Sequence, residues 1–231
     1  MRIGIIASSG GASFIAAKKI LDNNSLFKHT FFVIVDRDCG LFDYCVKHGI
    51  QVSKIQAQTN EVFSIKAAKQ LDTWGNIRFS LLFFSRLVTE GLYAKHKLIN
   101  IHPSFLPKFK GFNAVERALA EKSVQLGATA HLVDESIDGG DIIVQTTFKL
   151  TPKVWDNPEL GNKISYLQKI WLVLFIVNFI EQSGCESTTI SSLFDINNTK
   201  DNFPKVDPPL NNYCYLNALV LLQQHENITV Y

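Results

Sequence analysis

The chain has 231 residues, of which 46% are hydrophobic and 19% are charged, so it can bury a sizeable core and wholesale disorder is excluded. Its formal net charge of +2 offers no broad electrostatic footprint for nucleic acid or an anionic membrane. The four cysteines form no CxxC pair and no zinc-finger spacing, so we interpret them as reduced thiols of a cytoplasmic protein and expect no metal. The most apolar run, residues 170–177, is shorter than the roughly 18 residues of a membrane span.

Short continuous apolar runs alternate with segments of helical composition through residues 1–150. We predict strands at residues 2–7, 30–35, 51–53, 79–84, 97–101, 128–133 and 142–148, and helices at residues 14–21, 41–48, 60–71, 113–122 and 164–182. Continuous apolar runs are typical of strands that are covered on both faces, and interleaved helices supply that cover. The pattern therefore predicts an α/β fold with a Rossmann-like, mostly parallel sheet and flanking helices.

The helical segments also predict which surfaces are buried. In the segment 60–71, Asn60 suits the N-cap and one face carries Val62, Ile65, Ala68 and Leu71. The segment 164–182 is apolar around most of its circumference, so it must bury against the sheet or a partner subunit. Residues 170–177 and 216–222 are both too apolar for a solvent face, and we expect a homodimer through one of them.

A change in composition near Ser183 divides the chain. Residues 187–202 are rich in Ser, Thr, Asn and Asp, as linkers are, and apolar residues return after Phe203. We therefore predict a domain at residues 1–182, followed by a linker and C-terminal extension at residues 183–231.

A glycine-rich turn follows the first strand, and it is the first candidate binding site. Its backbone at Gly10, Gly11, Ala12 and Ser13 could approach an anion at the start of a helix. The turn is neither GxGxxG, because Ser13 occupies the third glycine position, nor a P-loop. A tight turn that needs glycine for its backbone angles is an equally good interpretation.

Polar residues at the end of the strand near residue 100 form the second candidate. With the two-residue period of a strand, Asn100 and His102 point the same way and could stabilise an oxyanion, although a structural histidine is the more common case. Asp138, in an acidic loop, would raise the pKa of His102 if the two lie close together, whereas the Asp-Gly pair also suits a simple turn. For His131 we favour a buried core histidine over a second polar group of the site.

These segments together resemble the folate-dependent formyltransferases. The resemblance rests on Asn-Ile-His-Pro-Ser-Phe-Leu-Pro-Lys-Phe-Lys-Gly at residues 100–111 and on Asp-Glu-Ser-Ile-Asp-Gly-Gly-Asp at residues 134–141. It is closest to the glycinamide ribonucleotide (GAR) transformylases and spans roughly residues 1–182. The resemblance implies direct formyl transfer from N10-formyltetrahydrofolate to a primary amine, with no metal and no covalent enzyme intermediate.

By the same resemblance, Asn100, His102 and Asp138 are the expected catalytic trio. Asn100 and a protonated His102 would donate hydrogen bonds to the formyl oxygen, while Asp138 would keep His102 charged and help to move the proton. The residues implied for the folate pocket are Ser85, Arg86, Leu87, Val88, Asp134, Glu135, Ser136 and Ile137.

The acceptor side departs from the GAR transformylase pattern. The family's first turn reads Ser-Gly-X-Gly-Ser-Asn, so this chain lacks a hydroxyl at Ala12 and an amide at Ser13. The family's Gln-Glu-His in the long helix falls on residues 167–169, where the carboxylate is missing. Sugar N-formyltransferases share the trio, and Phe203 begins a Phe-Pro-Lys-Val stretch that resembles their tails. We therefore expect an amino-sugar nucleotide as acceptor, with GAR as the alternative.

Two further hypotheses remain open. A Rossmann-type nucleotide-binding module without catalysis rests on the glycine-rich turn alone, and an inactive formyltransferase-like scaffold would assemble through its apolar helix and tail. For a formyltransferase with either acceptor, the expected partner is a small amine that carries phosphate or a nucleotide. We expect it to bind neither nucleic acid nor a membrane.

Overall fold

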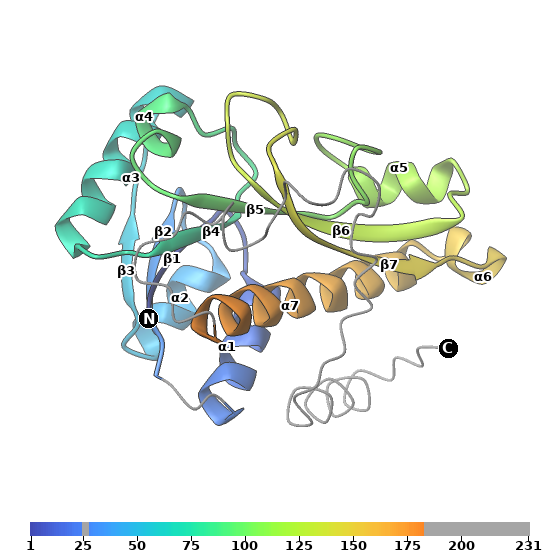
Figure 1. Cartoon of the computed structure of the whole chain (residues 1–231), viewed down its shortest axis with the longest axis horizontal. Helices are drawn as coiled ribbons and strands as arrows, with labels where there is room; N and C mark the ends of the chain where they lie inside the picture. The colour runs from blue at the N-terminus through green and yellow to red at the C-terminus, as the bar shows by residue number, and fades with distance from the viewer. Residues whose placement is uncertain (25–27, 183–231) are drawn as a thin grey trace.

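The structure is a computed structural model that describes residues 1–24 and 28–182 (Figure 1). The described residues form a seven-stranded sheet in the order β3-β2-β1-β4-β5-β6-β7. The strands are β1 (Arg2–Ala7), β2 (Thr30–Val35), β3 (Gln51–Lys54), β4 (Phe79–Phe83), β5 (Leu98–His102), β6 (Gln125–Leu132) and β7 (Ile142–Lys149). The helices are α1 (Ala12–Asn24), α2 (Gly40–Lys47), α3 (Asn60–Trp74), α4 (Glu90–Tyr93), α5 (Ala114–Ala120), α6 (Pro152–Trp155) and α7 (Pro158–Gln182). Strands β1 to β5 pair in parallel and β6 and β7 are antiparallel, which confirms the predicted α/β fold with a mostly parallel sheet.

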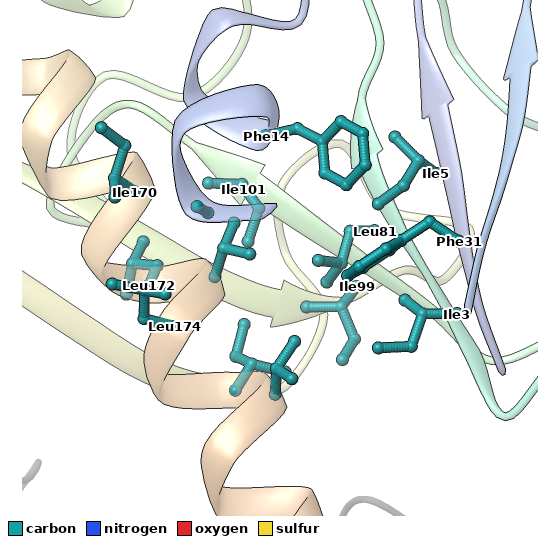
Figure 2. Packing of buried hydrophobic residues seen from close by; sticks show 14 of the residues in the cluster. Ile3, Ile5, Phe14, Phe31, Leu81, Ile99, Ile101, Ile170, Leu172 and Leu174 are labelled. Atoms are coloured by element: carbon teal, nitrogen blue, oxygen red, sulfur yellow. The ribbon is translucent and has the colours of Figure 1, made fainter. Parts of the chain in front are cut away.

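Helices cover both faces of the sheet, as the continuous apolar strands predicted. On one face, α1 and α7 pack over the strands, where Phe14, Ile101 and Ile170 share one buried cluster (Figure 2). On the other face, Phe63 of α3 packs in a second cluster with Ile6 of β1. Successive side chains of β1 point to opposite faces of the sheet, and both faces are covered by helices. Apolar and polar residues therefore do not alternate along β1, as they would in a half-exposed strand.

Helix α7 is a core helix of this chain, so burial within the fold accounts for the apolar residues 170–177, which therefore no longer indicate a dimer. Ile170, Leu174 and Val177 are each at most 1% exposed because α7 lies against α1 and the sheet. The part Pro158–Val177 is long and apolar enough to cross a membrane by length and composition, but most of it is buried inside the fold. Residues 216–222, the other predicted dimer surface, lie outside the described residues.

Helix α7 begins six residues earlier than predicted, because its first turns are polar and carry no apolar pattern. The Asn157 side chain accepts a hydrogen bond from the Leu160 N–H at 3.1 Å, and the Gly161 N–H donates to the Asn157 carbonyl at 3.1 Å. Pro158 occupies the first turn, where its missing N–H costs nothing. Capping chemistry at Asn157, rather than hydrophobic periodicity, marks this helix start.

The buried face of α3 is rotated about the helix axis relative to the predicted one. Val62 and Ile65 are each 40% exposed, whereas Phe63, Ala67, Ala68 and Leu71 are buried. The N-cap is Thr59, whose hydroxyl accepts from the Val62 N–H at 3.1 Å, and not Asn60. Phe63 stacks on Phe84 with ring centroids 4.6 Å apart, so the aromatic side chain sets which face turns inward.

A buried polar network holds the loop that follows β5. The Thr129 hydroxyl donates to the Ser104 carbonyl at 2.7 Å and accepts from the Leu106 N–H at 3.1 Å. The Gln145 amide nitrogen donates to the Leu106 carbonyl at 3.0 Å and to the Thr129 hydroxyl at 2.9 Å. Because these groups are buried, each bond also avoids the cost of an unpaired polar atom. The loop after His102 is thereby fixed to β6 and β7.

Replacing Gly127 with Ala should destabilise the protein by about 2–3 kcal/mol, because the new methyl group has no room. A Cβ at Gly127 would lie 2.8 Å from the Phe105 nitrogen and 2.9 Å from the Phe105 Cα, so the backbone of the loop must move. Chemical denaturation measures the effect. Gly40→Ala is the matched control, since its Cβ would meet only the Gly10 Cα at 3.6 Å. Equal stability of both variants would contradict the predicted clash.

Candidate active site

A cavity of about 620 Å³ lies at the carboxyl ends of β1, β4 and β5. Parallel sheets bind ligands at this edge, where loops leave the strands. The cavity is lined by residues 82–88, 100–103, 111–113, 131 and 133–138, with parts of the glycine-rich turn, Tyr166 and Lys169. The three residues expected to be catalytic are all among those that line it.

Asn100, His102 and Asp138 meet around one carboxylate. The Asn100 amide nitrogen donates to Asp138 Oδ1 at 3.0 Å, and His102 Nδ1 lies 3.3 Å from Asp138 Oδ2. The Gly111 N–H also donates to Oδ2, at 2.8 Å. Asp138 lies in the loop of the antiparallel hairpin that β6 and β7 form. This loop returns to the end of β5 and brings the Asp138 carboxylate next to Asn100 and His102. The structure thus brings together all three residues that the sequence singled out.

His131 is a fourth member of this cluster, which the sequence analysis did not place there. It is 2% exposed, and its Nδ1 lies 2.8 Å from the Leu132 carbonyl. A carbonyl only accepts, so Nδ1 carries the hydrogen, and Nε2 of a neutral ring is free to accept. Nε2 lies 3.1 Å from the Asn100 amide nitrogen and 3.5 Å from Asp138 Oδ1. His131 is therefore both a buried core histidine and part of the polar site.

These contacts occupy the amide of Asn100. Its nitrogen has two hydrogens, and they face Asp138 Oδ1 and His131 Nε2. To donate to a ligand oxygen, Asn100 has to exchange one of these two bonds. The sequence analysis expected the Asn100 amide to be free to bind an oxyanion. In this structure both of its hydrogens already have an acceptor.

His102 is buried, with 5% exposure, and its Nε2 lies 2.9 Å from the Phe109 carbonyl. That carbonyl requires a hydrogen on Nε2, so Nδ1 is the nitrogen that gains or loses a proton. Burial is the largest effect and lowers the pKa of His102, and the charge of Asp138 and the Phe109 carbonyl, which raise it, do not offset the net decrease. The expectation that Asp138 keeps His102 charged is therefore not met in this structure, because desolvation is the larger effect.

Asp138 is held as a carboxylate. Burial on its own raises its pKa, but the contact with His131, the hydrogen bond from the Gly111 N–H and the nearby imidazole of His102 lower the pKa of Asp138 to about 2. Its side chain is only 11% exposed, so solvent screens these contacts little. Asp138 therefore supplies a fixed negative charge at neutral pH.

The low pKa of Asp138 predicts a loss of stability in acid. Its pKa in the folded protein, about 2, lies below the ordinary value of 3.8 in the unfolded chain, so the stabilisation is present above pH 4 and is lost as the pH falls towards 2. The shift corresponds to about 2 kcal/mol. Urea denaturation at pH 5 and pH 2.5 should show this extra loss in the wild type and not in Asp138→Asn. Parallel pH dependences of the two proteins would contradict the assignment.

The predicted folate residues lie together on one side of the cavity. All eight of them line it: Ser85, Arg86, Leu87, Val88, Asp134, Glu135, Ser136 and Ile137. The Arg86 side chain donates to Asn60 Oδ1 at 3.1 Å and to the Ala57 carbonyl at 3.2 Å, so its charged group is held by α3 and the loop before it. Leu87 and Ile137 are 46% and 55% exposed and offer apolar surface for an aromatic ring system. Phe112, which is 67% exposed at the same cavity, was missed by the sequence analysis.

On the acceptor side, Gly11, Ala12 and Ser13 line the cavity, and Gly10 does not. Gly11 has a φ of +64°, and a Cβ there would lie 2.8 Å from the Leu41 side chain, so this position requires glycine. Helix α7 contributes Tyr166 and Lys169, which the sequence analysis did not assign to the site. Among the described residues, no group of His, Cys, Asp and Glu is arranged to hold a metal ion.

Comparison with known proteins gives consistent matches. The family model described as "Formyl transferase" matches residues 1–176. The "Trifunctional purine biosynthetic protein adenosine-3" of Drosophila pseudoobscura pseudoobscura is 28% identical over 175 residues, which cover 72% of this chain and 13% of that protein. The chain thus spans only about an eighth of that relative.

A bacterial relative and a crystal structure are also similar to this chain. The "Phosphoribosylglycinamide formyltransferase" of Haemophilus influenzae is 42% identical over 57 residues, which are 25% of this chain and 27% of that protein. The crystal structure of phosphoribosylglycinamide formyltransferase from Bacillus halodurans superposes with a TM-score of 0.70 at 26% identity, covering 79% of this chain and 97% of that chain. The similarity therefore extends over the sheet and the helices that form the cavity.

Proposed function

We propose, because the chain belongs to the Formyl transferase family, that it transfers the formyl group of N10-formyltetrahydrofolate to the amine of phosphoribosylglycinamide. One observation carries the proposal: Asn100, His102 and Asp138, far apart in the sequence, converge in one cavity between the folate-side residues and the start of α1. The non-catalytic nucleotide-binding module does not account for that convergence.

The choice of acceptor reverses the preference of the sequence analysis. An amino-sugar nucleotide was favoured there, on two departures in the acceptor side and a short stretch in the tail. The relative from Haemophilus influenzae and the Bacillus halodurans structure are both named as phosphoribosylglycinamide formyltransferases. This similarity covers the catalytic region, whereas the tail stretch at Phe203 lies outside the described residues. We therefore rank GAR first and the amino-sugar nucleotide second.

In the proposed reaction, the neutral amine attacks the formyl carbon. A new N–C bond forms, negative charge develops on the formyl oxygen, and the attacking nitrogen becomes positive. Asn100 can donate to that oxygen by giving up its bond to His131, and a well-placed donor of this kind lowers the barrier by about 3 kcal/mol. The fixed charge of Asp138 stabilises the positive nitrogen.

The proton then moves from the attacking nitrogen to the leaving N10. Burial keeps His102 neutral, so its Nδ1 can accept a proton from the side of Asp138, 3.3 Å away. The imidazolium that forms donates from Nε2 to the Phe109 carbonyl and from Nδ1 to Asp138. It returns the proton to N10 as the bond between N10 and the formyl carbon breaks. The products are the formamide and tetrahydrofolate, with no net change in the protein.

A formyl-transfer assay on the full chain tests the proposal. N10-formyltetrahydrofolate is supplied with GAR, with the same compound lacking phosphate, or with nucleotide-linked amino sugars. We expect formyl-GAR as the main product, at a rate on the order of 1–100 per second. Transfer only to an amino sugar would overturn the choice of acceptor, and transfer to no amine would overturn the activity.

We also propose that residues 1–182 form the catalytic domain and that residues 183–231 are a separate extension. The family model ends at residue 176, six residues before this boundary, which supports the division. A variant that stops after Gln182 should then retain formyl transfer, and a loss of activity on truncation would assign the extension to the active enzyme.

The cytoplasm remains the compartment that we propose. In the described part of the chain, Cys39 and Cys45 are both unpaired. Unpaired thiols are typical of reducing compartments, which supports this assignment.

A further inference from the structure

The backbone between residues 109 and 111 holds two members of the catalytic trio. His102 Nε2 donates to the Phe109 carbonyl at 2.9 Å, and the Gly111 N–H donates to Asp138 Oδ2 at 2.8 Å. These two bonds fix the imidazole and the carboxylate relative to each other. The orientation of this short segment therefore decides how both groups are presented to the cavity.

The peptide group between Lys110 and Gly111 connects Asp138 to helix α5. Its N–H donates to Asp138, and its carbonyl accepts a hydrogen bond from an Arg117 guanidinium nitrogen at 2.5 Å. This peptide bond is planar and trans, so its carbonyl and its N–H point in opposite directions, and a group that fixes one also fixes the other. Arg117 therefore sets the direction of the N–H that holds Asp138.

The backbone on both sides of Lys110 needs such support. Phe109 has a φ of +56° and Gly111 a φ of +78°, both in the left-handed region. A large aromatic residue such as Phe109 adopts this region only where its surroundings hold it there. The Arg117 guanidinium carbon also lies 5.9 Å from the centre of the Phe109 ring. One side chain thus contacts both Phe109 and the carbonyl that follows it.

Arg117 is not among the described residues that line the cavity, so it acts on the reaction only through this segment and through its charge. A guanidinium on the carbonyl polarises the peptide group and makes its N–H a stronger donor. Its charge also adds to the decrease in the pKa of His102, in which burial is the largest effect, Asp138 acts in the opposite direction and His131 in the same one. Both effects favour a carboxylate at Asp138 beside a neutral imidazole at His102.

We propose that Arg117 is a positioning residue of the active site, which directs the Gly111 N–H toward Asp138 by holding the Lys110 carbonyl. The catalytic consequence of this role rests on the proposed function. The role also has a consequence that needs no activity, because the Gly111 amide should exchange its hydrogen with solvent more slowly when Arg117 is present.

Steady-state kinetics with Arg117→Met and Arg117→Lys test the effect on catalysis. Methionine has neither donor nor charge, whereas lysine keeps both, and the contact with Lys110 needs only one nitrogen. We expect kcat to fall about 10- to 30-fold in the Met variant and less than about three-fold in the Lys variant, with KM for both substrates within about two-fold of the wild type. Lys122→Met, which removes an exposed positive charge just after α5, should leave kcat unchanged. An unchanged kcat in Arg117→Met, or an equal loss in both Arg117 variants, would overturn the inference.

Hydrogen exchange of the Gly111 amide separates this role from the proposed function and from a general loss of stability. NMR spectroscopy measures it in the full chain without substrates, for the wild type, both Arg117 variants and Lys122→Met. We expect exchange at Gly111 to be about 10-fold faster in Arg117→Met alone, while the buried amide of Ile5 in β1 exchanges as in the wild type.

If the wild type formylates no amine, the proposed function fails, yet faster exchange confined to the loop around Gly111 would still assign this peptide group to Arg117. Equal exchange at Gly111 in the wild type and Arg117→Met, or an equal acceleration at Gly111 and Ile5, would overturn the positioning role whatever the assay shows.

Discussion

Replacing Asp138 with Asn should lower kcat by about 1,000-fold while leaving the fold intact. The carboxylate accepts from the Asn100 amide and the Gly111 N–H and faces both histidines. An amide of the same shape has one acceptor oxygen and carries no charge, so it cannot stabilise the positive nitrogen or the imidazolium of His102. Its NH2 group would also meet either the Asn100 amide or the Gly111 N–H, donor against donor.

Single-turnover formyl transfer measures the chemical step directly, and the KM for N10-formyltetrahydrofolate should change by less than about three-fold, because Asp138 acts on the reacting atoms. Asp141→Asn is the matched control, since Asp141 is in the same loop, is exposed and does not line the cavity. If Asp138→Asn retained a third or more of the wild-type rate, the proposed mechanism would fail.

The architecture could be predicted because short stretches of the sequence are enough to identify its strands and helices. Continuous apolar runs such as residues 30–35 mark strands covered on both faces, and those strands are buried by helices as expected. The two-residue period of a strand was likewise enough to place Asn100 and His102 on the same side of β5. Asp138 was a candidate from its acidic loop, but only the resemblance placed it beside His102, because nothing local indicates that a loop 36 residues after His102 returns to the same cavity.

What the sequence did not predict depends on contacts across the fold. His131 is in the site because it pairs with Asn100 in the register of β5 and β6, which no pattern within one strand encodes. Lys169 is in the site because α7 presents one turn to the cavity while the apolar residues after it face the sheet. The same packing removes residues 170–177 from the surface, so their hydrophobicity indicated burial within the chain and not a dimer.

The charge state of His102 was predicted wrongly for a related reason. The sequence suggested a neighbouring carboxylate but could not show how deeply the imidazole lies, and burial is the effect that decides the direction of its pKa shift. Because the pKa of His102 is lowered, its effect on the reaction should depend on pH.

Replacing His102 with Gln should lower kcat/KM by about 100- to 1,000-fold near pH 7.5, because the site then lacks the group that accepts the amine's proton. The pKa of His102 is lowered from its ordinary value of 6.5, so the imidazole is neutral and active above that pH. As the pH falls below 6.5 and through the lowered pKa, His102 becomes protonated and loses this function. The advantage of wild type over variant should therefore shrink in acid.

The ratio of kcat/KM for wild type and His102→Gln, measured from about pH 5 to pH 8, isolates this effect. Protonation of the acceptor amine affects both enzymes equally and cancels in the ratio, and Asp138, with a pKa of about 2, stays ionised throughout. His96→Gln is the control, because His96 lies 3.2 Å from Asp72 and does not line the cavity. A large ratio that stays constant over the whole range would mean that His102 positions the substrates without exchanging a proton. A ratio that grows in acid would mean that the charged imidazolium is the working form.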